Sequence, residues 1–152
     1  MLDVTEASAA IDRDLMFDVF TRLRMLGVGL SLDNFGTGMS SLTELYRMPY
    51  SEIKVDHSLI ADAAQEREAM LIVRAIADLA HTLQLAVCAE GVETHKMLEF
   101  VRSSGFDSAQ GRLFSRPVQA SEIEGILKAW PCVEPAAKGS AAEIQALSVG
   151  GR

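Results

Sequence analysis

The feature that most constrains the fold is a strand, a polar strand end, a glycine turn and a helix start, in that order. Apolar residues alternate with small or polar ones from Val28 to Asp33, as in a strand with two different faces. Asn34 follows, and Gly36-Thr-Gly38 then allows a sharp backbone turn. Ser41 and Glu44 form a capping box that opens a helix. Because α/β proteins bind ligands at the carboxyl ends of their strands, this stretch predicts a site.

Four further units of the same kind are predicted around this one. Alternating strands and helices in this number imply parallel strands joined by right-handed crossovers. The predicted strands are 2–5, 28–34, 52–56, 85–90 and 106–110, and the predicted helices are 15–26, 41–47, 66–84, 95–103 and 121–130.

The two faces of the predicted strands decide between an open doubly wound sheet and part of a barrel. Ile53 and Val55 give one strand an apolar face, whereas Lys54 and Asp56 make its other face polar. Strands buried between two helix layers are usually apolar on both faces, so a barrel with a polar mouth fits better. We therefore expect an α/β fold, a partial (β/α)8 TIM-type barrel of about five βα units. The segment 131–152, rich in Ala, Gly, Ser and Pro, is predicted to be a flexible C-terminal tail.

Polar residues gather at the predicted carboxyl ends of the strands. Crowded carboxylates repel one another unless cations neutralise them, and Mg²⁺ or Mn²⁺ prefers such oxygen ligands. Two such metals can activate a water for phosphodiester hydrolysis, and a lysine beside them can orient that water or offset phosphate charge. The residues concerned are Asp3, Asp33, Asn34, Lys54, Glu90 and Gln110.

The composition excludes several other classes of function. A net charge of −7 argues against a nucleic-acid polymer as partner, because such partners need clustered Lys and Arg. Cys88 and Cys132 are isolated, which indicates neither a disulfide framework nor a zinc site and fits a reducing cytoplasm. No long apolar run predicts a membrane span, and no signal peptide is recognisable, so we expect a cytoplasmic protein without membrane contact.

Four motifs carry a resemblance to a known family. Asp33-Asn-Phe-Gly-Thr-Gly-Met-Ser-Ser-Leu42 resembles the Asp-Asp-Phe-Gly-Thr-Gly-Tyr-Ser-Ser-Leu signature of EAL domains, the bacterial cyclic-di-GMP phosphodiesterases. Ile53-Lys-Val-Asp56, Ala89-Glu-Gly-Val-Glu-Thr94 and Gln110-Gly-Arg-Leu-Phe-Ser-Arg-Pro117 follow in the family's order and at its spacing. The resemblance covers residues 1–130 and implies the same barrel. It corresponds to the C-terminal part of an EAL domain, after the Glu-x-Leu motif that names the family.

The resemblance implies a role for each residue at the strand ends. Asp33 matches a metal ligand, and Glu90 matches a residue of the metal centre that serves as ligand or general base. Lys54 matches the catalytic lysine near the attacking water, and Gln110 matches a residue beside the substrate. The implied cofactor is a pair of Mg²⁺ or Mn²⁺ ions.

Four other positions have more open roles under the same resemblance. Asp3 stands where the family has a glutamate metal ligand. Glu6 matches a residue that braces the loop after Asp33, and Glu93 matches a supporting glutamate, although either could be a plain surface carboxylate. Arg116 either contacts the phosphate or guanine of the substrate or forms a structural ion pair.

The sequence also departs from the family pattern at three positions. Asn34 replaces an aspartate that contacts metal, and an amide can ligate a cation but brings no negative charge. Asn34 could equally be a loop-forming residue, since asparagine tolerates turn conformations. Met39 and Arg112 each stand where the family has a tyrosine.

Three functional hypotheses follow. The first is an EAL-type cyclic-di-GMP phosphodiesterase domain, which hydrolyses the dinucleotide to pGpG, truncated and inactive as this chain alone. The second is a non-catalytic regulatory module that binds a partner protein, with or without cyclic-di-GMP, and the third is a fragment of no independent function. Binding of cyclic-di-GMP is expected to be weak or lost. Open sheet edges and an apolar barrel interior predict self-association or a complementing protein chain.

Overall fold

The computed structural model describes residues 1–5, 13–37 and 42–129, and they form one alternating series of strands and helices. Every strand predicted from the sequence is present, with bounds within a few residues of those expected. The elements are β1 (Leu2–Thr5), α2 (Arg13–Met25), β2 (Leu30–Phe35), α3 (Leu42–Arg47), β3 (Glu52–Val55), α4 (His57–Ala63), α5 (Arg67–Thr82), β4 (Ala86–Ala89), α6 (His95–Ser103), β5 (Ser108–Ala109) and α7 (Ala120–Ala129).

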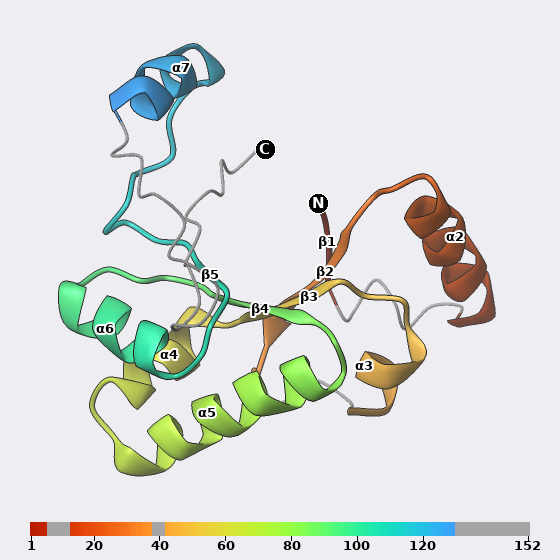
Figure 1. Cartoon of the computed structure of the whole chain (residues 1–152), viewed down its shortest axis with the longest axis horizontal. Coiled ribbons are helices and arrows are strands. Elements are labelled where there is room, and N and C mark those ends of the chain that lie inside the picture. The colour runs from red at the N-terminus through yellow and green to blue at the C-terminus, as the bar shows by residue number, and fades with distance from the viewer. Residues whose placement is uncertain (6–12, 38–41, 130–152) are drawn as a thin grey trace, which may run out of the picture.

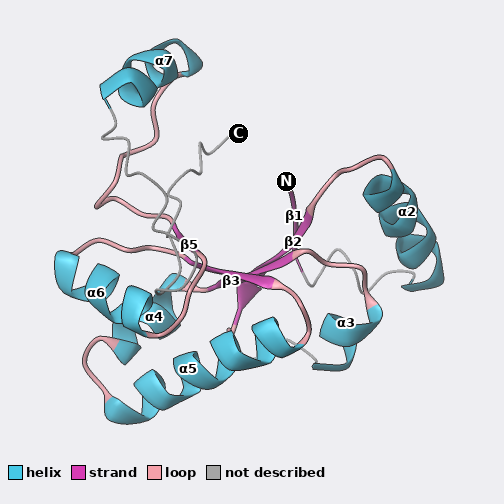
Figure 2. Ribbon diagram, viewed as in Figure 1, coloured by secondary structure: helices cyan, strands magenta, loops and turns pink. Residues whose placement is uncertain are grey.

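The strands form a single parallel sheet in the order β1-β2-β3-β4-β5. Figures 1 and 2 show α4, α5 and α6 gathered along one face of this sheet, while α7 stands apart at the end of an extended segment. Sequential parallel strands that are neighbours in space, with their crossover helices on one side, are the arrangement of a barrel wall. The predicted α/β fold is confirmed.

The hydrophobic core lies between the sheet and these helices. Val4, Leu32, Ile53 and Val87 occupy matching positions on four successive strands, and all four side chains are buried. Since side chains alternate between the two faces of a strand, this apolar row fixes which residues point the other way.

The face of the sheet away from the helices is polar. Ser31 is fully buried and donates a hydrogen bond from Oγ to Glu52 Oε1 at 2.8 Å. Lys54, two residues after Glu52 on the same face of β3, lies opposite Cys88 of β4. Burial raises the pKa of the Cys88 thiol to about 12, as expected for a small buried residue. The inner face is therefore not apolar, and the part of our self-association argument that rested on an apolar interior is wrong.

The pairing of β2 with β3 contains an irregularity at its carboxyl end. Leu32 pairs with Ile53 and Phe35 pairs with Val55, so Asp33 and Asn34 together lie opposite the single residue between those partners. Asn34 has a φ of 60° in the left-handed region, which asparagine tolerates better than most residues. This bulge keeps Phe35 buried while turning two polar residues out at the strand end.

Two helix predictions need correction. The helix α4 was missed, since the segment after β3 was not expected to turn into a helix before α5. Ser121 and Glu124 have the spacing of a capping box, which predicts a helix start at Ser121, but this prediction is wrong because α7 already begins at Ala120. At the start of α7, Glu122 accepts the backbone N–H of Gln119 at 3.0 Å.

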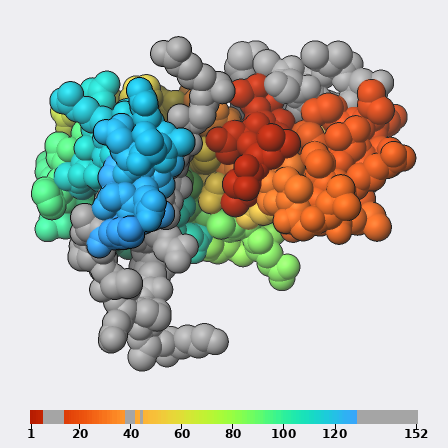
Figure 3. Space-filling model, turned by 90° about the horizontal axis from the view of Figure 1, so that it is seen from above, coloured from red at the N-terminus to blue at the C-terminus, as the bar shows by residue number. Residues whose placement is uncertain are grey.

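The helix α2 formed as predicted but is only shallowly packed. Phe20 is the buried side chain of its inner face, and its ring lies 6.1 Å from that of Tyr50. Phe17, Met25 and, just after the helix, Leu26 are exposed. Figure 3 shows α2, in orange, forming one side of the molecule beside β1 in red. No helix in the described part of the chain is long and apolar enough to cross a membrane.

Candidate functional site

Lys54 lies at the centre of the polar cluster on the inner face of the sheet. Its Nζ is 2.6 Å from Asp3 Oδ2 and 4.0 Å from Glu90 Oε1, and only 8% of its side chain is exposed. Asp3 belongs to β1 and Lys54 to β3, so the ion pair reaches across β2. Because two strand spacings amount to roughly 10 Å, a sheet that curves towards the inner face, as a barrel wall does, favours this contact.

The charges around Lys54 keep it protonated. Although burial disfavours the ammonium ion, the hydrogen bond and charge of Asp3, followed by the charges of Glu90 and Asp33, raise the pKa of Lys54 above its ordinary value. Lys54 is therefore a fixed buried cation facing three carboxylates. The structure places its side chain on the inner face, where the alternation of the strand predicted it.

Glu90 follows β4 and is held from both sides. Its backbone N–H donates to Val55 O at 3.0 Å, which ties it to β3, and its side-chain Oε1 accepts a hydrogen bond from Gln110 Nε2. Burial, and after it the charge of Asp33, raise the pKa of Glu90 to about 7, against the opposing effect of Lys54. The sequence placed Glu90, Gln110 and Lys54 together at the strand ends, and the structure does bring them together.

Asp33 and Asn34 form the third part of the cluster. Asn34 Nδ2 donates to Asp33 Oδ2 at 2.9 Å, so its amide is directed at the neighbouring carboxylate. Asn34 O also accepts a hydrogen bond from Thr37 Oγ1 at 3.2 Å, which closes the start of the glycine turn. Of the two interpretations left open for Asn34, the left-handed backbone and this turn contact support the loop-forming one.

Sequence reasoning missed the role of Asp56, which lies just after β3 and is buried. Its carboxylate accepts the backbone N–H of Ser58 at 2.9 Å and so forms the N-cap of α4. Although burial opposes ionisation, the hydrogen bonds from Ser58 and the nearby imidazole of His57 hold the pKa of Asp56 below its usual range. An aspartate two residues before a serine at a strand end was the signal that could have revealed this cap.

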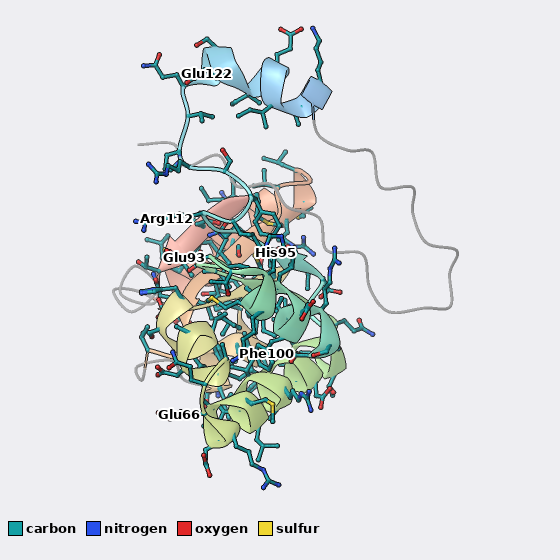
Figure 4. All side chains as sticks on the ribbon, turned by 90° about the vertical axis from the view of Figure 1, so that its left-hand side faces the viewer. Glu66, Glu93, His95, Phe100, Arg112 and Glu122 are labelled. Carbon is teal, nitrogen blue, oxygen red and sulfur yellow. The ribbon has the colours of Figure 1, made fainter. Side chains whose placement is uncertain are left out.

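The more peripheral candidates lie away from this cluster or beyond the described residues. Glu93 forms an ion pair with Arg112 at 3.3 Å, and both side chains are largely exposed. Figure 4 shows these two residues side by side, far from Glu66 at the start of α5. Arg116 is exposed in the segment before α7, and Glu6 lies outside the described residues. The roles predicted for Glu6, Glu93 and Arg116 therefore stay predictions.

The donor atoms of the cluster have the chemistry of a metal site but not its arrangement. Carboxylate and amide oxygens suit Mg²⁺ and Mn²⁺. Within the described ranges, however, no group of three His, Cys, Asp or Glu side chains is placed to hold a metal ion. Asp3, Asp33 and Glu90 each direct an oxygen at an N–H donor of the chain instead. The residues as arranged do not fit a bound metal pair, and their assignment as ligands remains a prediction.

The curved parallel sheet with acidic and amide groups at its strand ends defines the class of barrel-type α/β domains with a polar mouth. Residues 1–117 match the EAL domain family, and the chain belongs to that family. This confirms the resemblance drawn from the four sequence motifs.

Known relatives include cyclic-di-GMP phosphodiesterases. The cyclic di-GMP phosphodiesterase NbdA of Pseudomonas aeruginosa is 44% identical over 129 residues, which are 85% of this chain and 16% of NbdA. The chain spans between 15% and 18% of the length of the first curated relatives that it matches. The activity of those whole proteins therefore enters only as a proposal.

Solved EAL structures confirm the fold. The MucR phosphodiesterase of P. aeruginosa, crystallised with cyclic-di-GMP, superposes with a TM-score of 0.73 at 43% identity, over 80% of this chain and 49% of that one. BlrP1 of Klebsiella pneumoniae, crystallised with manganese and cyclic-di-GMP, superposes with a TM-score of 0.69 at 36% identity, over 75% of this chain and 29% of that one. The five described strands are thus part of an EAL-type barrel.

Proposed function

We propose that this chain carries the Lys54–Glu90 part of an EAL-type cyclic-di-GMP site and that, as a 152-residue chain alone, it binds the dinucleotide weakly without hydrolysing it. The observation that carries the proposal is the buried ammonium of Lys54, which lies between Asp3 and Glu90. Gln110 donates a hydrogen bond to the Glu90 carboxylate beside it. The ammonium of Lys54 has three N–H donors, of which one donates to Asp3, so the others are suited to the oxygens of a phosphodiester at this strand end. The cyclic-di-GMP complex of MucR, which shares the fold, supports this choice of ligand.

Hydrolysis is a separate matter from binding. The family's reaction depends on divalent metal ions, which supply an activated water and stabilise the leaving oxygen when bound. The described carboxylates are directed at N–H groups of the chain and do not form such a metal site. We therefore expect the lysine and amide groups to bind and orient the ligand without turning it over.

Binding should depend on Lys54. Isothermal titration of cyclic-di-GMP should give a weak but saturable signal with the wild-type chain, and Lys54→Ala should weaken it by at least about tenfold, or about 1.4 kcal/mol. Lys128→Ala is the matched control, because Lys128 pairs with Glu124 on the exposed surface of α7 and should leave binding unchanged. Equal affinity for the Lys54→Ala and Lys128→Ala variants would remove Lys54 from the site.

A regulatory module is the second candidate, and Asn34 favours it. The amide brings no charge where the family pattern has a carboxylate, and it already holds Asp33. A chain that retains Lys54 and Glu90 but has lost a charged metal ligand is suited to binding cyclic-di-GMP without hydrolysing it. Its binding to a partner protein would then depend on whether the dinucleotide is bound. Neither candidate forms pGpG, so cyclic-di-GMP-dependent binding of a partner protein is the result that distinguishes the regulatory module from the first candidate.

Exposed apolar side chains on and just after α2 support self-association or docking of a complementing chain. Phe17, Val19, Met25 and Leu26 all have exposed fractions of at least 40%. Large apolar side chains exposed in this number on one short segment commonly mark an interaction surface.

Sedimentation velocity at micromolar concentration tests this surface. We expect the wild-type chain to sediment as an oligomer and a Phe17→Glu, Met25→Glu double variant to shift towards monomer, because a charge at either position opposes its burial. Leu127→Glu, on the exposed face of α7, is the control that should not change the distribution. A compact, cooperatively unfolding wild-type monomer would contradict the proposal.

Two further expectations stay predictions. The cytoplasmic location was argued from isolated cysteines, of which Cys88 is a free buried thiol. The division into an EAL-like part at 1–130 and a flexible tail at 131–152 rests on composition, and the tail lies outside the described residues.

A further inference from the structure

Each of the three carboxylates in the cluster accepts a hydrogen bond from a side-chain N–H group of this chain. One donor lies in β3, one in the bulge of β2 and one directly after β5, so the three pairs do not repeat one local motif. The pairs are Lys54 with Asp3, Asn34 with Asp33 and Gln110 with Glu90.

The bulge between β2 and β3 is what allows Asn34 to take part. In a regular strand, successive side chains point to opposite faces, so Asn34 and Asp33 would point apart. The register shift and the φ of 60° at Asn34 instead let Nδ2 reach Asp33 Oδ2 at 2.9 Å. The chain thus uses a special backbone conformation to place an amide donor on this carboxylate.

An amide donor and a divalent cation both use lone pairs of the same carboxylate. A cation binds Asp33 through one or both carboxylate oxygens. For a cation to bind both, the N–H group that donates to Oδ2 must move away from that oxygen. Asn34 can offer a cation only its carbonyl oxygen, after rotation of the amide and without negative charge. In the absence of a metal ion, the N–H group of Asn34 therefore supplies the hydrogen bond that the Asp33 carboxylate accepts.

We infer that Asn34 is a positioning residue that holds Asp33 in a cation-free arrangement, and that this residue makes the site's geometry independent of divalent metal. Lys54 and Gln110 do the same for Asp3 and Glu90. The inference deepens the proposed function, and rests on it in taking these residues as the cyclic-di-GMP site.

Mn²⁺ alone is the probe, followed by the electron paramagnetic resonance signal of the free ion. Asn34→Asp removes the donor and adds a carboxylate, whereas Asn34→Gly removes the donor without adding charge. Aspartate and glycine both adopt the left-handed region, so the backbone at this position is preserved. We expect Mn²⁺ affinity to rise from wild type to Asn34→Gly to Asn34→Asp, with a gain of at least about tenfold for the last, because cation affinity follows the charge of the ligand set.

Gln84→Asp is the matched control. Gln84 is the other described non-glycine residue with a positive φ, also 60°, and it is exposed before β4, at the amino end of the strands. The Gln84→Asp variant carries the same added charge in the same backbone conformation and should bind Mn²⁺ no better than wild type. A purely structural role for Asn34 would leave Asn34→Gly with no more affinity for Mn²⁺ than the wild type.

Mn²⁺ binding by the wild type as tight as in both Asn34 variants would overturn the inference. If Asn34→Asp does not fold, the comparison of Asn34→Gly with wild type still decides, since no gain there also overturns it. Because the probe contains no nucleotide, a failure of cyclic-di-GMP binding counts against the proposed function alone, and the order of Mn²⁺ affinities still decides the role of Asn34.

Discussion

Fusing this chain to the part of the crystallised MucR domain that it does not match should give measurable hydrolysis of cyclic-di-GMP only when Asn34→Asp is also present. The chain matches 49% of that crystallised protein, so the fusion supplies the rest of an EAL domain. The 152-residue sequence has no Glu-x-Leu motif of its own, and its Asn34 amide is directed at Asp33. We therefore expect two separate features to limit hydrolysis by this chain.

The expected result is strongly non-additive. Groups that act as one catalytic unit do not each recover half of the rate, so the fusion alone and Asn34→Asp alone should both stay near background. The combination should exceed either by at least about 100-fold, the lower end of what one positioned catalytic group contributes. The measurement is the rate of pGpG formation, resolved by chromatography, with Mg²⁺ or Mn²⁺ present.

Controls for this experiment use the two lysines already compared for binding. Lys54→Ala in the active fusion should abolish turnover, since Lys54 is the buried cation between Asp3 and Glu90. Lys128→Ala should not, because its side chain is exposed on α7. Robust hydrolysis by the unmodified 152-residue chain would contradict both the proposed function and the role of Asn34.

The order of the strands and the residues at their ends could be predicted from sequence because both follow from local patterns. Alternation along residues 52–56 decides which side chains share a face, so the inward position of Lys54 follows from the sequence alone. Glu90 and Gln110 lie at the ends of successive parallel strands, and such ends meet at one edge of a sheet.

The features that the sequence did not reveal depend on contacts between separate segments. The bulge at Asp33 and Asn34 exists only in the register of β2 against β3. The ion pair of Asp3 with Lys54 needs β1 and β3 to lie on either side of β2, and the ion pair of Glu93 with Arg112 needs two loops to meet. None of these has a signature within a single stretch of chain, whereas the cap of α4 does and was overlooked.

The close packing of the chain next to Glu90 makes Gly91 important for stability. Gly91 has a φ of 67°, and a Cβ at this position would clash with His57 Cβ and lie 3.3 Å from His57 Cα. His57 opens α4 directly after the cap of Asp56, and Gly91 directly follows Glu90. A side chain at residue 91 would therefore push the start of α4 away from the end of β4.

Gly91→Ala should lower the free energy of unfolding by about 2–5 kcal/mol. About 1–2 kcal/mol of this comes from placing a Cβ in the left-handed region, and about 1–3 kcal/mol comes from overpacking against His57. Gly27→Ala separates the two causes, because Gly27 has a φ of 81° but no atom within 4 Å of the position that a methyl group would take, so it should lose only the first. Urea unfolding at a single fixed protein concentration measures both variants, since any self-association makes the midpoint depend on concentration.

Gly91→Ala should also weaken cyclic-di-GMP binding, because it separates Glu90 from Lys54, whereas Gly27→Ala should not. Equal losses of stability in the two variants would mean that the packing of Gly91 on His57 does not hold the site together.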